Sequence, residues 1–144
     1  MSYWDTSAVI KLYLDEPDSA DFRRIAAAVP RITISTLSWS EARVTFRRKE
    51  VDGSLPSGAT EQLMQKLFEN IEEGQIDSMM WGELLEPEAE RVIDRCWTRT
   101  PCIRVRTLDA IHIASAITAG ETVFVTADIR QRDAAAACGL VLLP

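Results

Sequence analysis

Short apolar runs alternate along the chain with longer stretches in which apolar residues recur every three or four positions. The short runs, rich in β-branched and aromatic residues, predict strands, and the longer periodic stretches predict helices. The predicted strands cover residues 2–4, 31–36, 76–81, 122–127 and 140–143. The predicted helices lie between them, and the clearest cover 60–74 and 108–120, the latter ending at Gly120.

This alternation of strands and helices, joined by short turns, is typical of a parallel sheet covered by helices. The run TVFVTA at 122–127 is almost continuously apolar, as expected for a strand buried on both faces. No internal repeat, low-complexity tract or linker interrupts the chain. We therefore predict a single domain over residues 1–144, a three-layer α/β/α sandwich with a central, mainly parallel sheet.

Composition is that of an ordinary globular protein, with 47% apolar and 26% charged residues. No apolar run approaches the roughly 20 residues that span a bilayer, and the first residues lack the order of a signal peptide. We expect a cytoplasmic protein without a membrane partner. Three cysteines without a C-x-x-C pair, together with one histidine, argue against a disulfide framework and a structural zinc site.

The net charge of −6 at first argues against a nucleic-acid partner, because phosphate binding is normally driven by basic surface. However, the cations are 13 Arg against only 3 Lys, and Arg suits bidentate phosphate contacts. They also occur in clusters, such as Arg47 with Arg48 and Arg104 with Arg106. An acidic protein of this kind can still present a basic groove.

Four acidic residues fall where the predicted topology would bring them together. Asp5 and Asp128 directly follow the first strand and the TVFVTA strand. Glu41 lies at the start of the helix after the second strand, and Asp109 lies in the first turn of helix 108–120. Open α/β sheets bind ligands at the carboxyl ends of their strands. Several carboxylates meeting there would repel one another unless a divalent cation were bound, and oxygen ligands favour Mg²⁺ or Mn²⁺.

Each acid also has a simpler interpretation. Asp5, Asp109 and Asp128 are all placed to cap a helix or to interact with its dipole, and Glu41 could be an exposed helix residue. The sequence alone does not exclude these roles for any single residue. Their shared topological position is what favours a common metal site.

The chain also resembles a known family. D-T-S-A at Asp5, S-E-A-R around Glu41, L-D-A-I-H-I-A-S-A from Leu108 and V-T-A-D ending at Asp128 resemble the acidic motifs of PIN-domain ribonucleases, and most closely those of VapC-type toxins. The motifs occur in order over essentially the whole chain. The resemblance implies a PIN-like fold and a Mg²⁺- or Mn²⁺-dependent endoribonuclease. Its catalytic, metal-binding quartet would be Asp5, Glu41, Asp109 and Asp128.

Further residues are candidates for supporting roles. Ser7 and Thr126 match small polar positions of the family motifs, and we expect them to orient carboxylates or water. Trp4 could form a wall of the site, whereas His112 is expected to pack or hydrogen-bond rather than to bind metal. The candidates for RNA phosphate contacts are Arg43, Arg47, Arg104 and Arg130.

The resemblance implies the toxin of a type II toxin–antitoxin pair. Its partners would be an RNA substrate and a VapB-type antitoxin, in a toxin homodimer that joins a larger hetero-oligomer with the antitoxin. A housekeeping PIN nuclease of RNA processing and a non-catalytic RNA-binding PIN domain are the alternatives. A receiver-like signalling domain is disfavoured, because no phosphoacceptor Asp follows the third strand and no Lys follows Lys66.

Overall fold

The computed structural model describes all residues 1–144 and contains one five-stranded sheet in the order β3-β2-β1-β4-β5. Every neighbouring pair of strands is parallel. The strands are β1 (Ser2–Trp4), β2 (Ile32–Ser35), β3 (Ile76–Met79), β4 (Val123–Val125) and β5 (Val141–Leu143). The predicted parallel sheet is therefore confirmed, with each strand within its predicted range.

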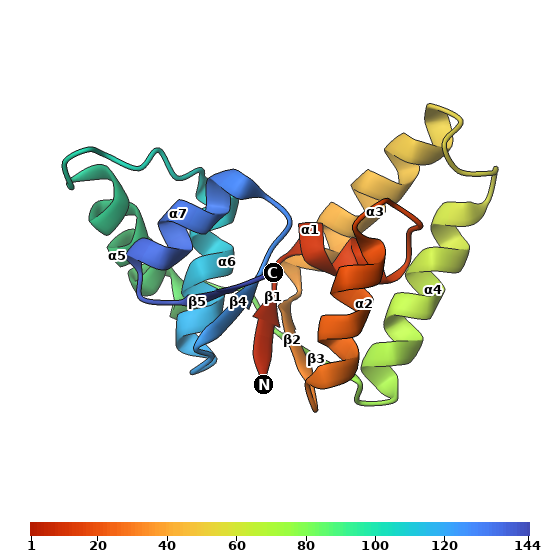
Figure 1. Ribbon diagram of the computed structural model, residues 1–144, viewed down its shortest axis with the longest axis horizontal. Coiled ribbons are helices and arrows are strands. Elements are labelled where there is room, and N and C mark those ends of the chain that lie inside the picture. Colours follow the sequence, from red (N-terminus) through yellow and green to blue (C-terminus); the bar gives the residue numbers. More distant parts are fainter.

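Helices connect successive strands and lie in two groups beside the sheet (Figure 1). One group packs with β1 and β2 around Phe22, Phe46 and Leu67, and the other packs around Val92, Ile113 and Ala134. The first group comprises α1 (Thr6–Val9), the 3-10 turn η1 (Ile10–Leu12), α2 (Ser19–Ala28), α3 (Leu37–Val51) and α4 (Ala59–Glu72). The second comprises η2 (Glu83–Leu85), α5 (Glu86–Trp97), α6 (Thr107–Thr118) and α7 (Ile129–Ala137). This arrangement confirms the predicted three-layer sandwich.

The two cores follow from the alternation of side chains along β1. Tyr3 stacks on Phe124 in the core beside α6, whereas Trp4 points to the opposite face and contacts Phe22 of α2 edge-on. Successive strand residues face opposite sides of a sheet, so both aromatic rings are fully buried, but in different cores. The expectation that Trp4 forms a wall of the site is therefore wrong.

The chain order of the strands creates a crevice beside β1. After β1 the chain continues to β2 on one side, whereas β4 returns on the other side, so the strand order reverses between β1 and β4. Such a point is where open α/β sheets bind ligands. Asp5 leaves β1 there, and its backbone N–H donates to the Val125 carbonyl at 3.1 Å. None of the helices combines the length and apolar character needed to cross a membrane.

Candidate active site

The four predicted acidic residues line one cavity of about 260 Å³. Asp5 comes from the end of β1, Glu41 from α3, Asp109 from the first turn of α6, and Asp128 from the residue before α7. Residues separated by more than a hundred positions in sequence thus meet at the carboxyl edge of the sheet. Asp5 and Asp128 also cap the helices that follow them, because they accept hydrogen bonds from the Ala8 and Arg130 backbones. Capping and membership of the site are therefore compatible.

Asp5 is the most buried of these carboxylates, with only 4% of its surface exposed. The Ser7 hydroxyl lies 2.8 and 2.9 Å from its two oxygens, and the Thr126 hydroxyl donates to Oδ2 at 2.9 Å. No Lys or Arg pairs with Asp5. Burial raises the pKa of Asp5 from 3.8 to about 6, although the charge of His112 and the hydrogen bonds oppose this rise. Asp5 is thus a buried carboxylate with a fixed orientation, and a bound cation would offset the cost of burying its charge.

Glu41 is held by a hydrogen-bond chain that extends into the core. Its Oε1 lies 2.6 Å from His112 Nε2 and accepts from the Thr6 hydroxyl at 2.7 Å. On the other side of the imidazole, His112 Nδ1 lies 2.8 Å from the Tyr3 hydroxyl. Burial alone would raise the pKa of Glu41, but the hydrogen bond and charge of His112, with the Thr6 bond, lower it below its usual value.

The protonation pattern of this chain follows from the ionised state of Glu41. A carboxylate only accepts hydrogen bonds, so His112 donates its Nε2 proton to Glu41. On its other side the ring is hydrogen-bonded through Nδ1 to the Tyr3 hydroxyl, so one imidazole links Glu41 to the core. His112 is 2% exposed and has the hydrogen-bonding and packing role expected from the sequence.

Asp109 and Asp128 are bridged by Arg106, the residue before α6. Its Nε donates to Asp109 Oδ2 at 2.9 Å, and its Nη2 donates to Asp128 Oδ2 at 2.8 Å. The two carboxylate side chains are 15% and 31% exposed, whereas that of Arg106 is 56% exposed. The guanidinium therefore lies at the rim of the cavity and neutralises part of its negative charge.

The donor set fits a hard divalent cation. All four acidic side chains offer oxygen ligands, which Mg²⁺ and Mn²⁺ prefer, and Asp5 is buried without a Lys or Arg partner. In the arrangement described here, however, no three acidic, histidine or cysteine side chains converge closely enough to hold one ion. Arg106 bridges two of the four carboxylates, and His112 hydrogen-bonds a third.

None of the four arginines predicted to contact phosphate lines this cavity. Arg43 and Arg47 both pair with Glu61 of α4 and do not line it. Arg130 lines an adjacent cavity that shares Ser7 and Asp128 with the acidic one. Arg104 is exposed and forms no ion pair. Their contact with phosphate stays a prediction.

Arg48 and Arg106 line the acidic cavity instead, and sequence reasoning missed both as site residues. A positional signal existed for each. Arg48 follows Glu41 by seven residues, which places the two side chains on one face of α3. Arg106 lies three residues before Asp109, in the extended residue before α6, close enough in sequence for its long side chain to reach that carboxylate.

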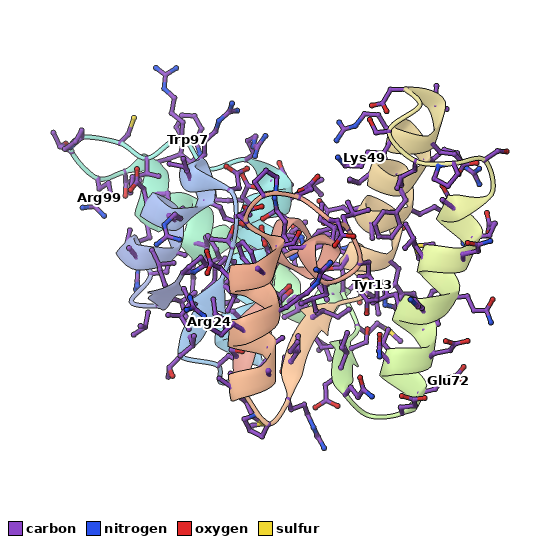
Figure 2. The ribbon with its side chains drawn as sticks, turned by 45° about the vertical axis from the view of Figure 1, so that its right-hand side comes forward. Tyr13, Arg24, Lys49, Glu72, Trp97 and Arg99 are labelled. Atoms are coloured by element: carbon purple, nitrogen blue, oxygen red, sulfur yellow. The ribbon has the colours of Figure 1, made fainter.

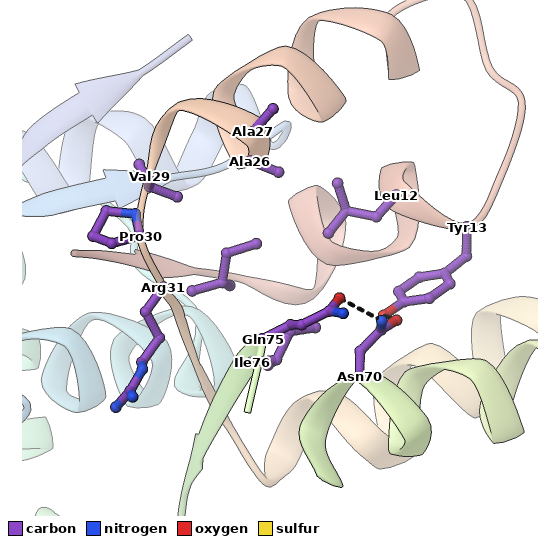
Figure 3. A pocket seen from close by; sticks show the side chains of 11 residues that line it. Leu12, Tyr13, Ala26, Ala27, Val29, Pro30, Arg31, Asn70, Gln75 and Ile76 are labelled. Atoms are coloured by element: carbon purple, nitrogen blue, oxygen red, sulfur yellow. Dashed lines mark hydrogen bonds between the residues drawn. The ribbon is translucent and has the colours of Figure 1, made fainter. Parts of the chain in front are cut away.

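A larger cavity of about 450 Å³ lies elsewhere, between α2, α4 and the start of β3 (Figure 3). Its lining is mostly apolar and contains no carboxylate; Arg31 is its only charged residue. Tyr13, labelled in Figure 2, directs its hydroxyl at Asn70 of α4, which in turn hydrogen-bonds Gln75. This cavity lacks the groups that hydrolytic chemistry needs.

The sequence also matches the model of a known protein family. The model of the PIN domain matches residues 2–137, nearly the whole chain. The chain belongs to the PIN domain family. The motif resemblance of its four acidic segments to PIN nucleases is thus matched by a family assignment that covers all four. No protein of curated function matches the sequence.

Solved structures share the complete PIN fold at low sequence identity. VapC20 of Mycobacterium tuberculosis, a sarcin-ricin loop cleaving toxin, superimposes with a TM-score of 0.73 at 16% identity, over 100% of both chains. VapBC2 of Rickettsia felis, bound to a DNA fragment from its promoter, gives 0.66 at 16% identity, over 99% of this chain and 98% of the other. A toxin–antitoxin complex of Klebsiella pneumoniae gives 0.67 at 12% identity, over 100% and 97%. At these identities the likeness demonstrates the PIN fold.

Proposed function

We propose that this PIN domain is a Mg²⁺- or Mn²⁺-dependent endoribonuclease. The observation that carries the proposal is that four carboxylates, from four separate segments, line one cavity at the carboxyl edge of the sheet. Such a set of oxygen ligands suits metal-assisted hydrolysis of a phosphodiester, and VapC20, which shares the PIN fold, is a sarcin-ricin loop cleaving toxin. Asp5, Glu41, Asp109 and Asp128 are the proposed catalytic and metal-binding residues.

The chain's own residues prepare the site in distinct ways. Ser7 and Thr126 fix both oxygens of Asp5, so the carboxylate keeps one orientation. His112 and Thr6 hold Glu41 ionised and direct it into the cavity. When bound, a divalent cation would lower the pKa of a water and stabilise the leaving oxygen of the phosphodiester. Arg48 and Arg106 place positive charge at the rim, where the RNA backbone would approach.

Metal dependence is the first test. Purified protein incubated with single-stranded RNA should cleave it in Mg²⁺ or Mn²⁺, and EDTA should abolish cleavage because the proposed site activates water through the bound ion. Excess metal should then restore it. End mapping should find 5′-phosphate and 3′-hydroxyl products. Cleavage that persists at the same rate in EDTA would contradict the proposal, and binding without cleavage in either metal would favour a non-catalytic RNA-binding domain.

We further propose that the nuclease is the toxin of a toxin–antitoxin pair. Its support is that several solved structures with the same fold are complexes of toxins with antitoxins. Its partners would then be RNA and a VapB-type antitoxin, in a homodimer that joins a larger hetero-oligomer.

The toxin role predicts a cellular phenotype. Induced expression should arrest growth, and co-expression of the small protein encoded next to the gene should relieve the arrest. A variant without Asp5 provides the control, because it should leave growth unaffected with or without the neighbour. Normal growth during expression of an active nuclease would instead favour a housekeeping role.

A further inference from the structure

Arg106 stands out because it pairs with two of the proposed metal ligands at once. It precedes α6 in extended conformation, and its guanidinium reaches both Asp109 and Asp128 through different nitrogens. A single positive group thus lies against two carboxylates that come from separate helices. A divalent cation held by Asp109 and Asp128 would interact with the same two negative charges.

Arg106 and a metal ion cannot use these carboxylates in the same way. Asp109 Oδ2 and Asp128 Oδ2 each lie within 3 Å of a guanidinium nitrogen, so both oxygens are occupied. The structure correspondingly contains no convergent metal cluster. A divalent cation held by the two carboxylates would repel the guanidinium and compete with it for their negative charge.

The Arg106 side chain is suited to leaving. More than half of it is exposed, and ion pairs at such positions are only weakly stabilising because solvent screens them. The displaced guanidinium would stay at the rim, tethered by its own backbone just before α6. A planar guanidinium beside a nuclease site is well suited to a bidentate contact with a phosphate.

We propose that Arg106 is a built-in counter-cation of the acidic cavity. It competes with the metal for Asp109 and Asp128, and when the metal displaces it, it binds a phosphate of the RNA. This inference rests on the proposed function, since it assumes the same metal site and substrate. Arg106 would thus pair with the two carboxylates before the metal binds and with an RNA phosphate afterwards. Metal binding and substrate binding would then both depend on this one side chain.

Arg104 provides a matched control two residues away. It is exposed, belongs to the same segment before α6 and forms no ion pair. Arg104→Gln therefore removes the same charge from nearly the same place without freeing a carboxylate. Arg106→Lys completes the set, because it keeps the charge but loses the fork that spans the two acids.

The first measurement is calorimetric titration of each folded variant with Mn²⁺ in the absence of RNA. Arg106→Gln should bind Mn²⁺ about three- to tenfold more tightly than the parent, as expected for the loss of a partly exposed ionic competitor. Arg104→Gln should stay within about twofold of the parent, and Arg106→Lys should fall between the two. Equal affinities for Arg106→Gln and Arg104→Gln would overturn the competition.

The second measurement is the affinity for a labelled single-stranded RNA at saturating Mn²⁺, by fluorescence anisotropy, with RNA integrity checked on a denaturing gel. Arg106→Gln should bind this RNA about three- to tenfold more weakly, because one phosphate contact is lost. A structural role alone would not tighten metal binding while weakening RNA binding. RNA affinity of Arg106→Gln equal to that of the parent would overturn the phosphate contact.

The two proposals fail in different ways. If the parent binds Mn²⁺ and cleaves RNA but Arg106→Gln binds Mn²⁺ and RNA as the parent does, only the role of Arg106 is overturned. If no variant binds Mn²⁺, both the role of Arg106 and the metal-dependent function are overturned.

Discussion

Replacing Asp5 with Asn is expected to abolish RNA cleavage and, at the same time, to make the fold more stable. Asn keeps the shape of the side chain: its oxygen, at the Oδ1 position, can accept from Ser7, and its amide nitrogen, at the Oδ2 position, can donate to the Thr126 hydroxyl, which can donate to Gln131 instead. It removes the charge that a divalent cation needs. Loss of one ligand carboxylate of this kind should reduce the cleavage rate at least about 100-fold, since the chemistry depends on the bound ion.

The gain in stability follows from the raised pKa of Asp5. Burial raises this pKa from 3.8 to about 6 in the folded state. Below pH 3.8 Asp5 is protonated in both the folded and the unfolded chain, and as the pH rises through about 6 it ionises in the folded protein at a cost. Its contribution to stability is therefore largest in acid and lost above about pH 6. At about 1.4 kcal/mol per pKa unit, Asp5→Asn should gain roughly 1–3 kcal/mol at neutral pH.

Urea unfolding in EDTA tests this, at pH 7.5 and again near pH 4. The advantage of Asp5→Asn should be present at the higher pH and shrink at the lower one. Asp133→Asn is a suitable control, because Asp133 is exposed on α7 and forms no ion pair, so neither stability nor cleavage should change. Cleavage by Asp5→Asn at the parental rate would remove Asp5 from the proposed site.

The fold and the shared location of the four acids could be predicted from the sequence, because both depend on local patterns that mark where strands and helices begin and end. Strand and helix periods mark the elements, and the carboxyl-end rule for parallel sheets brings Asp5 and Asp128 to one edge without any knowledge of packing. Asp109 joins them because the first turn of α6 faces this edge. Ser7 hydrogen-bonds Asp5 because it lies in the helix turn that Asp5 caps.

Side-chain pairing could not be predicted in the same way, because it depends on the rotation of each helix and on the pleat of each strand. Trp4 faces the core rather than the site because strand alternation turns it away. Arg43 lies two residues after Glu41, which puts it on another side of α3, toward Glu61. The pairing of Arg106 with Asp128, 22 positions away in sequence, depends on how α6 and α7 pack and has no signal in the sequence.

Removing His112 is expected to have a second large effect, because its imidazole hydrogen-bonds Glu41 in the site and Tyr3 in the core. His112→Ala leaves the Glu41 carboxylate and the buried Tyr3 hydroxyl without their shared partner. Unpaired buried polar groups are costly, so the free energy of unfolding should fall by about 2–4 kcal/mol at neutral pH. RNA cleavage should fall about 10- to 100-fold, as is typical when a group that orients a metal ligand is removed.

A double-mutant cycle separates the loss of this pairing from the loss of packing. In Glu41→Gln the half-buried charge is already absent, so adding His112→Ala should cost at least about 1 kcal/mol less than it does in the parent. Tyr3→Phe breaks only the inner hydrogen bond and leaves Glu41 paired with His112, so its effect on cleavage should be the smallest. If His112→Ala costs the same in the parent and in the Glu41→Gln background, His112 serves packing alone. A smaller cost in the Glu41→Gln background, together with weaker cleavage by His112→Ala, would identify the imidazole as the group that holds Glu41 ionised and aimed at the site.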